Sequence, residues 1–414
     1  TLTDNIAHGE SGASWDFAGH GGAILCDSRS ATTVIGCEIS GNSSYLNPAA
    51  TGGKGGGICC YNADGVEIIN CTIINNDYSQ HDYGGGIHIE TSANVLVSGC
   101  IVEGNRGDYR GEGVFIFGST DVTVEFSDIN ANGTTSTSGY GHGLAVIESS
   151  DSILINSCQI KNNGSIAGIG RGGGVTAEDS TNVTFNYCDI SNNTANQGGG
   201  VYLENCSPDI LDCTVSNNTT AGTVSYGAGG ICCWTGASPY IHRSIIEWNE
   251  MTKSSTFKNG GGVYCWDGTS PFIQSCRIRY NMAQDEGGGV FVYGSASPSI
   301  LLSEISFNSA DAGGGIAASN NTVLWSCLIT NNTAQVGAGV LCDDVDTSIT
   351  FCTFNLNEAE VSGGGVMCNG ASSNPQIENN IFWGNAVQTP TAPELEQIGM
   401  NSGVPTVNYC NVEG

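Results

Sequence analysis

The feature that most constrains this chain is a block of residues that recurs along its whole length. Residues 260–308, GGGVYCWDGTSPFIQSCRIRYNMAQDEGGGVFVYGSASPSILLSEISFN, contain the block nearly twice. Each copy begins with a glycine cluster and ends with an Asn. The glycine clusters end at Ala23, Gly57, Gly86, Gly113, Gly143, Gly174, Gly200, Gly230, Gly262, Gly289, Gly315, Gly339 and Gly365. A recurrence about every 30 residues indicates a repeat architecture in which each copy is one structural unit.

The residues that follow each glycine cluster alternate in character. The first column is apolar throughout: Ile24, Ile58, Ile87, Val114, Leu144, Val175, Val201, Ile231, Val263, Val290, Ile316, Val340 and Val366. The second column is mixed and includes Leu25, His88 and Tyr264, whereas the third is small or apolar again, as at Ile89 and Val146. A period of two is typical of β-strands with one buried face. We therefore expect each strand to stack in register on its counterpart in the next block.

A second pattern, Cys-x-apolar-x-x-Asn, closes each block. Its Asn residues are Asn42, Asn76, Asn105, Asn132, Asn163, Asn193, Asn218, Asn249, Asn281, Asn308, Asn332, Asn357 and Asn385, and TLTDN fits the tail of one more copy, ending at Asn5. Stacked Asn side chains can hydrogen-bond to one another and to the neighbouring backbone, so we expect an Asn ladder at one bend.

These patterns predict an all-β fold, a parallel β-helix (solenoid) of about 14 coils with three short strands per coil, and the resemblance described below implies that the β-helix is right-handed. In the coil that starts at Gly198 we expect strands at 201–203, 209–212 and 214–216. We expect a single parallel β-helix domain over 1–414, in which 386–414 forms an irregular C-terminal cap.

The block resembles the right-handed β-helix repeat of secreted bacterial and archaeal surface proteins. GGAI (21–24), FNLN (354–357) and FWGN (382–385) are similar to motifs of the polymorphic outer-membrane protein family, whose β-helical passengers are adhesins. The resemblance implies a secreted or cell-surface protein with a structural or adhesive role. Its partners would be other copies of itself, or a glycan or other partner on a cell surface.

The charge balance excludes several classes of partner. Lys and Arg number 11 against 40 Asp and Glu, and the formal net charge is −29. A chain so poor in basic residues cannot neutralise phosphates, so we expect no binding to nucleic acid. No stretch has the length and apolar character of a transmembrane helix, so we expect no membrane insertion by this chain.

Most of the 19 cysteines fall in two columns that should point inward. One precedes the Asn bend: Cys37, Cys71, Cys100, Cys158, Cys188, Cys213, Cys276, Cys327, Cys352 and Cys410. The other is the third column after the glycines: Cys26, Cys60, Cys233, Cys265, Cys342 and Cys368. Two interpretations stay open: buried thiols that act as small hydrophobic side chains, or disulfides within a coil, such as Cys26 with Cys37. Cys59, Cys206 and Cys232 lie outside both columns and are candidate surface thiols.

No catalytic constellation stands out in the sequence. GHG (141–143) and RIR (277–279) resemble fragments of the polygalacturonase pattern, but the acidic cluster that should precede GHG is missing. His142 falls on a glycine mark, which favours a role as a corner residue. Neither the histidines nor the cysteines have the spacing of a metal site, and a surface Ca²⁺ has no motif to support it. We therefore predict no enzyme activity and no cofactor.

Aromatic residues in the second and fourth columns after the glycines exceed what the repeat needs. The candidate binding residues are Tyr202, Trp234, Tyr264, Trp266, Phe291 and Tyr293. In-register stacking would place their rings about one strand spacing apart, on a face that we expect to be exposed. The face would bind sugar rings, contact another rod, or only stabilise the sheet. Sugar binding underlies the alternative function, a carbohydrate-binding or polysaccharide-degrading β-helix.

Two further expectations concern the edges of the repeat array. Long inserts at 43–57, 133–143 and 250–262 fall between the Asn bend and the next glycine cluster, and either form a recognition edge or reflect neutral variation in loop length. Apart from the candidate cap at 386–414, both end coils look cut and not capped. We expect an excised piece of a longer polypeptide, or a subunit that stacks end to end into a filament or sheath.

Overall fold

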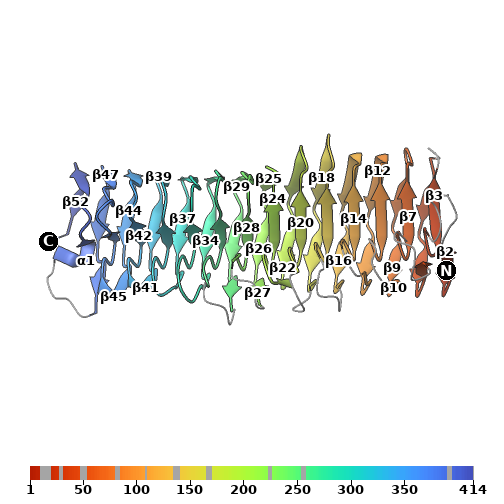
Figure 1. The fold of residues 1–414 in the computed structure, drawn as a ribbon, viewed down its shortest axis with the longest axis horizontal. Helices are drawn as coiled ribbons and strands as arrows, with labels where there is room; N and C mark the ends of the chain where they lie inside the picture. Colours follow the sequence, from red (N-terminus) through yellow and green to blue (C-terminus); the bar gives the residue numbers. More distant parts are fainter. Residues whose placement is uncertain are drawn as a thin grey trace. The chain divides into compact units, whose positions relative to one another are not determined.

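The computed structural model describes residues 1–9, 20–27, 31–46, 54–79, 84–107, 110–133, 140–164, 170–221, 226–252, 258–388 and 394–413. The inserts at 43–57, 133–143 and 250–262 therefore lie partly outside the described residues. The chain divides into two compact units, Thr1–Asp209 and Ile210–Gly414. Each unit is built from short parallel strands stacked side by side in three long sheets (Figure 1).

The first unit contributes the following strands. Its first sheet, which follows the glycine clusters, contains β3 (Ile24–Asp27), β7 (Ile58–Tyr61), β11 (Ile87–Glu90), β14 (Val114–Phe117), β17 (Leu144–Ile147), β20 (Val175–Glu178) and β24 (Val201–Glu204). Its second sheet contains β4 (Thr33–Ile35), β8 (Glu67–Ile69), β12 (Ala93–Ser98), β15 (Thr120–Glu125), β18 (Ile153–Asn156) and β21 (Val183–Asn186), and β25 (Asp209–Leu211) lies at the unit boundary. Its third sheet contains β1 (Leu2–Thr3), β5 (Glu38–Ser40), β9 (Thr72–Ile74), β13 (Ile101–Glu103), β16 (Asp128–Asn130), β19 (Gln159–Lys161) and β22 (Asp189–Ser191).

The second unit repeats this arrangement. Its first sheet contains β28 (Ile231–Cys233), β32 (Val263–Cys265), β35 (Val290–Val292), β38 (Ile316–Ala318), β42 (Val340–Asp343), β46 (Val366–Asn369) and β50 (Ile398–Asn401). Its second sheet contains β29 (Tyr240–His242), β33 (Phe272–Gln274), β36 (Ser299–Leu301), β39 (Val323–Trp325), β43 (Ser348–Thr350), β47 (Gln376–Glu378) and β51 (Thr406–Asn408). Its third sheet contains β26 (Thr214–Ser216), β30 (Ile245–Glu247), β34 (Arg277–Arg279), β37 (Glu304–Ser306), β40 (Leu328–Thr330), β44 (Thr353–Asn355), β48 (Ile381–Trp383) and β52 (Asn411–Val412).

Short strands follow the Asn bend in some coils. They are β2 (Ile6–Gly9), β6 (Ser43–Leu46), β10 (Asp77–Ser79), β23 (Thr194–Ala195), β27 (Thr219–Thr220), β31 (Glu250–Met251), β41 (Thr333–Val336), β45 (Glu358–Ser362) and β49 (Ala386–Val387). Within the described residues the helix α1 (Glu394–Gln397) is the only helix. Segment 386–414 holds α1, but it also adds strands β50, β51 and β52 to the three sheets. That 1–414 folds as one domain stays a prediction.

The pairing of the strands confirms the predicted parallel β-solenoid. Ile58 pairs with Ile87, and Ile87 pairs with Val114, so equivalent columns stack in register. These first-column side chains are fully buried and form the core inside the coils. The expected strands of the coil that starts at Gly198 agree with β24, β25 and β26 to within one residue.

The Asn ladder is present in both units. The backbone N–H and the Nδ2 group of Asn308 both donate to Oδ1 of Asn332, at 3.0 Å each. Nδ2 of Asn308 also donates to the backbone oxygen of Ile278 at 2.9 Å. Asn76, Asn105 and Asn132 in the first unit make the same contacts with their neighbours. The ladder therefore satisfies buried polar groups of the bend in every coil where it continues.

Two glycines of each cluster serve different purposes. Gly287 has a φ of +67°, which a residue without Cβ adopts at least cost. Gly289 has an ordinary φ, but a Cβ there would lie 2.5 Å from the backbone oxygen of Gly315 in the next coil. The cluster therefore combines a left-handed corner with a close approach between coils.

The structure records all 19 cysteines as free thiols, and all except Cys37 and Cys410 are buried. The expectation of surface thiols at Cys59, Cys206 and Cys232 is wrong, because all three are buried. At Cys59 the chain before the glycine cluster covers the side chain, since a Cβ at Gly55 would lie 3.0 Å from Cβ of Cys59.

Candidate functional site

The predicted aromatic face is only partly exposed. Tyr202, Tyr264 and Phe291 have exposed fractions of 0%, 1% and 1%. Trp234 and Trp266 are half-buried, and Tyr293 is 45% exposed. The expectation of an exposed face is therefore wrong for the second column and holds only in part for the fourth.

The burial follows from the path of the chain before each glycine cluster. A Cβ at Gly287 would lie 2.6 Å from Cβ of Phe291, so the backbone there lies directly over the second-column side chain. At Gly260 the corresponding distance to Cβ of Tyr264 is 3.0 Å. These rings are on the outer face of the first sheet, yet the chain at Gly260 and Gly287 covers them, and the centroids of Tyr264 and Phe291 lie 5.3 Å apart.

The rings in the second unit do stack as predicted. The centroids of Trp234 and Trp266 lie 4.6 Å apart with an interplanar angle of 9°, and those of Trp266 and Tyr293 lie 4.9 Å apart at 19°. Tyr226 adds a ring whose centroid lies 4.7 Å from that of Trp266. Because stacked rings cover each other's faces, this column offers mainly ring edges to a ligand. The geometry favours stabilisation of the sheet over sugar stacking here.

Tyr202 belongs to an ionic cluster on the first unit. Its hydroxyl donates to Oε2 of Glu204 at 2.9 Å, and Arg171 contacts the same carboxylate oxygen at 2.7 Å. The Arg171 guanidinium also lies over the rings of Tyr202 and Tyr140, at 5.0 and 5.2 Å from their centroids. In this cluster the tyrosine rings are therefore in contact with a guanidinium group, whereas the rings of the second unit stack on one another.

Glu178 extends this ionic cluster by one coil. It pairs in register with Glu204, and its Oε2 lies 3.3 Å from Nη2 of Arg110. Burial raises the pKa of Glu178 above its ordinary value; Arg110 opposes this, and the neighbouring Glu204 carboxylate adds to it. Two carboxyl groups one coil apart therefore occupy different electrostatic environments.

The GHG motif places His142 inside the first unit. The side chains of His142 and Glu112 are both fully buried, and Nδ1 of His142 lies 3.2 Å from Oε2 of Glu112. The RIR motif lies on β34 of the second unit, where Arg279 contacts Glu247 at 2.7 Å. His142 is thus a buried corner residue, in keeping with the interpretation that the sequence favours.

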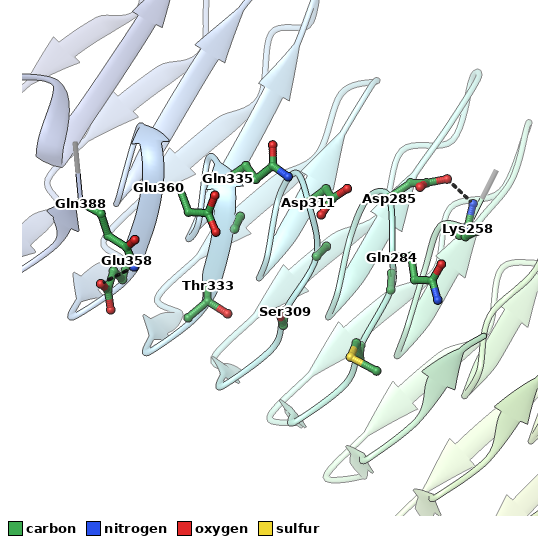
Figure 2. Close-up of a pocket in the computed structure, with 14 residues that line it drawn as sticks. Lys258, Gln284, Asp285, Ser309, Asp311, Thr333, Gln335, Glu358, Glu360 and Gln388 are labelled. Carbon is green, nitrogen blue, oxygen red and sulfur yellow. Dashed lines mark hydrogen bonds between the residues drawn. The ribbon is translucent and has the colours of Figure 1, made fainter. Parts of the chain in front are cut away.

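The second unit also has a groove of about 510 Å³ beside the Asn ladder. Figure 2 shows its polar side chains in a row along successive coils. The groove is lined by Lys258, Met282, Ala283, Gln284, Asp285, Ser309, Ala310, Asp311, Thr333, Ala334, Gln335, Glu358, Glu360 and Gln388.

Two exposed columns and one buried column shape this groove. The first exposed column runs through Met282, Ser309, Thr333 and Glu358, which pair in register; Ser309 is half-buried and the other three are exposed. The second exposed column is Gln284, Asp311, Gln335, Glu360 and Gln388. The alanines between the two columns are buried, and their small side chains leave the hollow between the polar ones.

Hydrogen bonds hold this polar lining in place. The backbone N–H of Asp311 donates to the oxygen of Gln284 at 3.2 Å, and that of Gln335 donates to the oxygen of Asp311 at 2.8 Å. Nε2 of Gln388 donates to Oε1 of Glu358 at 2.9 Å, and the backbone N–H of Lys258 donates to Oδ2 of Asp285 at 2.8 Å (Figure 2). The spacing of the lining is therefore set by the backbone of the coils.

A partly exposed aromatic stack lies near this lining, two residues before the first exposed column. Trp248, Tyr280 and Phe307 each precede a ladder Asn, and all three have φ between 55° and 57°. Their centroids lie 4.4 and 4.9 Å apart, and Trp248 is 54% exposed. The groove and this stack together form the most distinctive surface of the second unit.

Comparison with known proteins decides the family. A model of the right-handed β-helix region matches residues 13–160 and 229–412. The chain belongs to the right-handed β-helix family. A search of curated proteins gave no match. Among solved structures, a rhamnogalacturonan lyase aligns at 10% identity over 98% of this chain and 80% of that one, with a TM-score of 0.20, which supports no argument about function.

The groove of this right-handed β-helix has a sequence signal that the repeat analysis missed. The ladder Asn opens a short motif in the last coils: NMAQ (281–284), NSAD (308–311), NTAQ (332–335), NEAE (357–360) and NAVQ (385–388). Its fourth position supplies the second exposed column of the groove. Alignment on the ladder Asn, in place of the glycines, would have shown this column of amide and carboxylate side chains.

Within the described part of this β-helix, no group of three or more His, Cys, Asp or Glu side chains is arranged to hold a metal ion. No helix in that part is long and apolar enough to cross a membrane.

Proposed function

We propose that this right-handed β-helix is a secreted or cell-surface adhesive protein that binds an extended carbohydrate along the groove of its second unit. The observation that carries the proposal is the recurrence of polar side chains once per coil in that groove. The proposal combines the adhesive role predicted from the sequence with the carbohydrate binding of the alternative function. It moves the binding site from the aromatic face to the groove.

The spacing of the groove suits a polysaccharide better than a peptide. Neighbouring strands of a sheet lie about 4.8 Å apart, so equivalent groove residues recur at that distance. A sugar unit in an extended polysaccharide advances by a similar length, and each coil would then meet an equivalent set of hydroxyls. A peptide strand rises only about 3.3 Å per residue, so its residues would no longer align with equivalent groove residues after two coils.

The chemistry of the lining also suits sugar hydroxyls. A carboxylate such as Asp311 accepts hydrogen bonds, and an amide such as Gln335 both donates and accepts, so together they satisfy hydroxyl groups of either orientation. Asp285, Asp311, Glu358 and Glu360 make the groove acidic. This charge disfavours uronate polymers and favours neutral or amine-bearing sugars.

Affinity measurements with matched variants test the proposal. Gln335→Ala should weaken binding of neutral or amine-bearing oligosaccharides about tenfold, as for the loss of one or two good hydrogen bonds. Gln376→Ala removes an exposed amide from the second sheet of the same unit and should leave the affinity unchanged. Equal affinities for both variants, or no binding of any neutral or amine-bearing oligosaccharide by the parent chain, would contradict the proposal.

Cell-surface adhesion through other contacts remains part of the proposal. The likeness to polymorphic outer-membrane adhesins, a bacterial or archaeal source and end-to-end association into a filament stay predictions. Partners would be glycans, other cell-surface molecules or further copies of the chain. The net charge of −29 supports the expectation that nucleic acid is not among them.

A second candidate function is polysaccharide hydrolysis at Glu178 and Glu204 of the first unit. A carboxyl group with a raised pKa close to a second carboxyl group is an arrangement that glycoside hydrolases use, and Glu178 pairs in register with Glu204. Glu178→Gln and Glu204→Gln should each abolish release of reducing ends, whereas Glu148→Gln, at an exposed corner, should not. Release of reducing ends that is equal in all three variants would exclude this site.

A further inference from the structure

The inward cysteines of the first sheet occur only as neighbouring pairs. Cys26 pairs in register with Cys60, Cys233 with Cys265, and Cys342 with Cys368. The coils on either side of these pairs place other residues in the same column. The flanking residues are Ile89, Val292, Ala318 and Met400.

Packing alone does not explain this pairing. A single cysteine fits such a column as well as a single alanine or valine does. The column before the Asn bend shows this: Cys276 stands there with Ser303 in the next coil, and its N–H donates to the Ser303 hydroxyl at 3.1 Å. A column filled only by size would contain single cysteines too, so the strict pairs of the first sheet point to chemistry between the two thiols.

The strand register places the two cysteines of each pair side by side on neighbouring strands. Register partners in parallel strands lie about 4.8 Å apart, within the range of about 4.4–6.8 Å between the Cα atoms of disulfides. Both side chains of each pair point inward and are almost completely buried. The Cys60 thiol lowers the pKa of Cys26, and the Cys265 thiol raises the pKa of Cys233.

We propose that Cys26–Cys60, Cys233–Cys265 and Cys342–Cys368 are sites of disulfide formation between neighbouring coils. In each pair one thiolate attacks a low-molecular-weight disulfide, which leaves a mixed disulfide and releases one low-molecular-weight thiolate. The second thiolate of the pair then attacks the protein sulfur of that mixed disulfide and displaces the other low-molecular-weight thiolate. The pair loses two protons and two electrons, and one molecule of the oxidant is reduced to two thiols. The product is a covalent link from one coil to the next, in contrast to the links within a coil considered from the sequence.

Burial determines when these links form. Burial raises the pKa of Cys342 to about 12. A protonated thiol is a poor nucleophile, and no oxidant reaches it in the closed core. The links therefore form while the coils assemble, and oxidation of the folded, reduced protein is slow.

Refolding in a glutathione buffer tests the proposal. The reduced, denatured chain is refolded with oxidised and reduced glutathione, alkylated in denaturant and mapped by mass spectrometry. The expected result is three links between the named partners, which leaves six fewer cysteines to alkylate than in the fully reduced chain. Alkylation of all 19 cysteines, links within a coil such as Cys26–Cys37, or links confined to the column before the Asn bend would overturn the proposal.

Two serine variants sharpen this test. Cys265→Ser should remove the link to Cys233 and leave Cys233 open to alkylation, with the other two links intact. Cys276→Ser is the matched control, because it removes a buried cysteine of the other column and should leave all three links in place. The mapping of the parent chain decides the proposal by itself if either variant fails to fold.

Discussion

At the scale of single residues, the side chain that matters most is the Asn that closes each coil. Asn332 accepts hydrogen bonds from the backbone and side chain of Asn308, and donates to Asn357 and to the backbone oxygen of Ile305. A single Asn thus satisfies polar groups in three successive coils.

Removal of one ladder side chain should therefore be costly. We expect Asn332→Ala to lower the free energy of unfolding by about 3 kcal/mol, because several buried polar groups lose their partners. Urea unfolding measures the change. Asn331→Gly is the control, since Asn331 is an outer corner residue with a φ of +55° that glycine adopts readily. A ladder variant as stable as this control would show that the stack contributes little.

Glu90 makes the stability of the first unit depend on pH. Burial opposes its ionisation, but the hydrogen bond and charge of His88, with Lys54 beside them, lower the pKa of Glu90 to about 2. Oε2 of Glu90 lies 2.8 Å from Nε2 of His88 and 2.6 Å from Nζ of Lys54. The pKa is lower in the folded protein than in the unfolded chain. The ionised group therefore stabilises the fold above its ordinary pKa of 4.5.

This contribution should be lost as the pH falls from about 5 to about 2. We expect a loss of roughly 2 kcal/mol over that range, measured as the difference between the parent chain and Glu90→Gln in urea unfolding at each pH. The two proteins should differ most at neutral pH and least at pH 2. A difference that does not change with pH would contradict the assignment.

At the scale of the elements, the sequence predicts the strands well and their surroundings poorly. Alternation after the glycine clusters correctly predicts which side chains of the first sheet point into the coils. It does not predict that the backbone at Gly260 and Gly287 lies over Tyr264 and Phe291. A period of two distinguishes the faces of a strand, but it contains no information about what covers the outer face.

Two tyrosines on neighbouring strands test this correction. Tyr264 on β32 is 1% exposed, whereas Tyr293, which follows β35, is 45% exposed. Tyr264→Ala should lower the free energy of unfolding by about 3–5 kcal/mol, as for other buried aromatic residues, and Tyr293→Ala by about 1 kcal/mol or less. Urea unfolding of both variants makes the comparison. Equal losses would support the exposed face expected from the sequence.

At the scale of the whole molecule, the repeat predicts the fold but not the binding site. Every coil contributes equivalent residues to the core and to the Asn ladder. The sequence columns that all coils share therefore describe only the scaffold. The groove depends on the fourth residue of motifs such as NTAQ (332–335), which alignment on the glycines leaves unaligned. The ionic cluster of Arg171 and Glu204 was likewise missed, because its members come from different coils and have no fixed spacing in sequence.

The most direct test of the account is the length dependence of oligosaccharide binding. If each coil of the groove contacts one sugar unit, the affinity of the intact chain should rise with each added sugar up to about five units, matching the five polar residues from Gln284 to Gln388, and then level off. Titration calorimetry with a series of neutral or amine-bearing oligosaccharides of defined length measures this. An affinity that is independent of length, or that rises equally in the Gln335→Ala variant, would contradict binding along the groove.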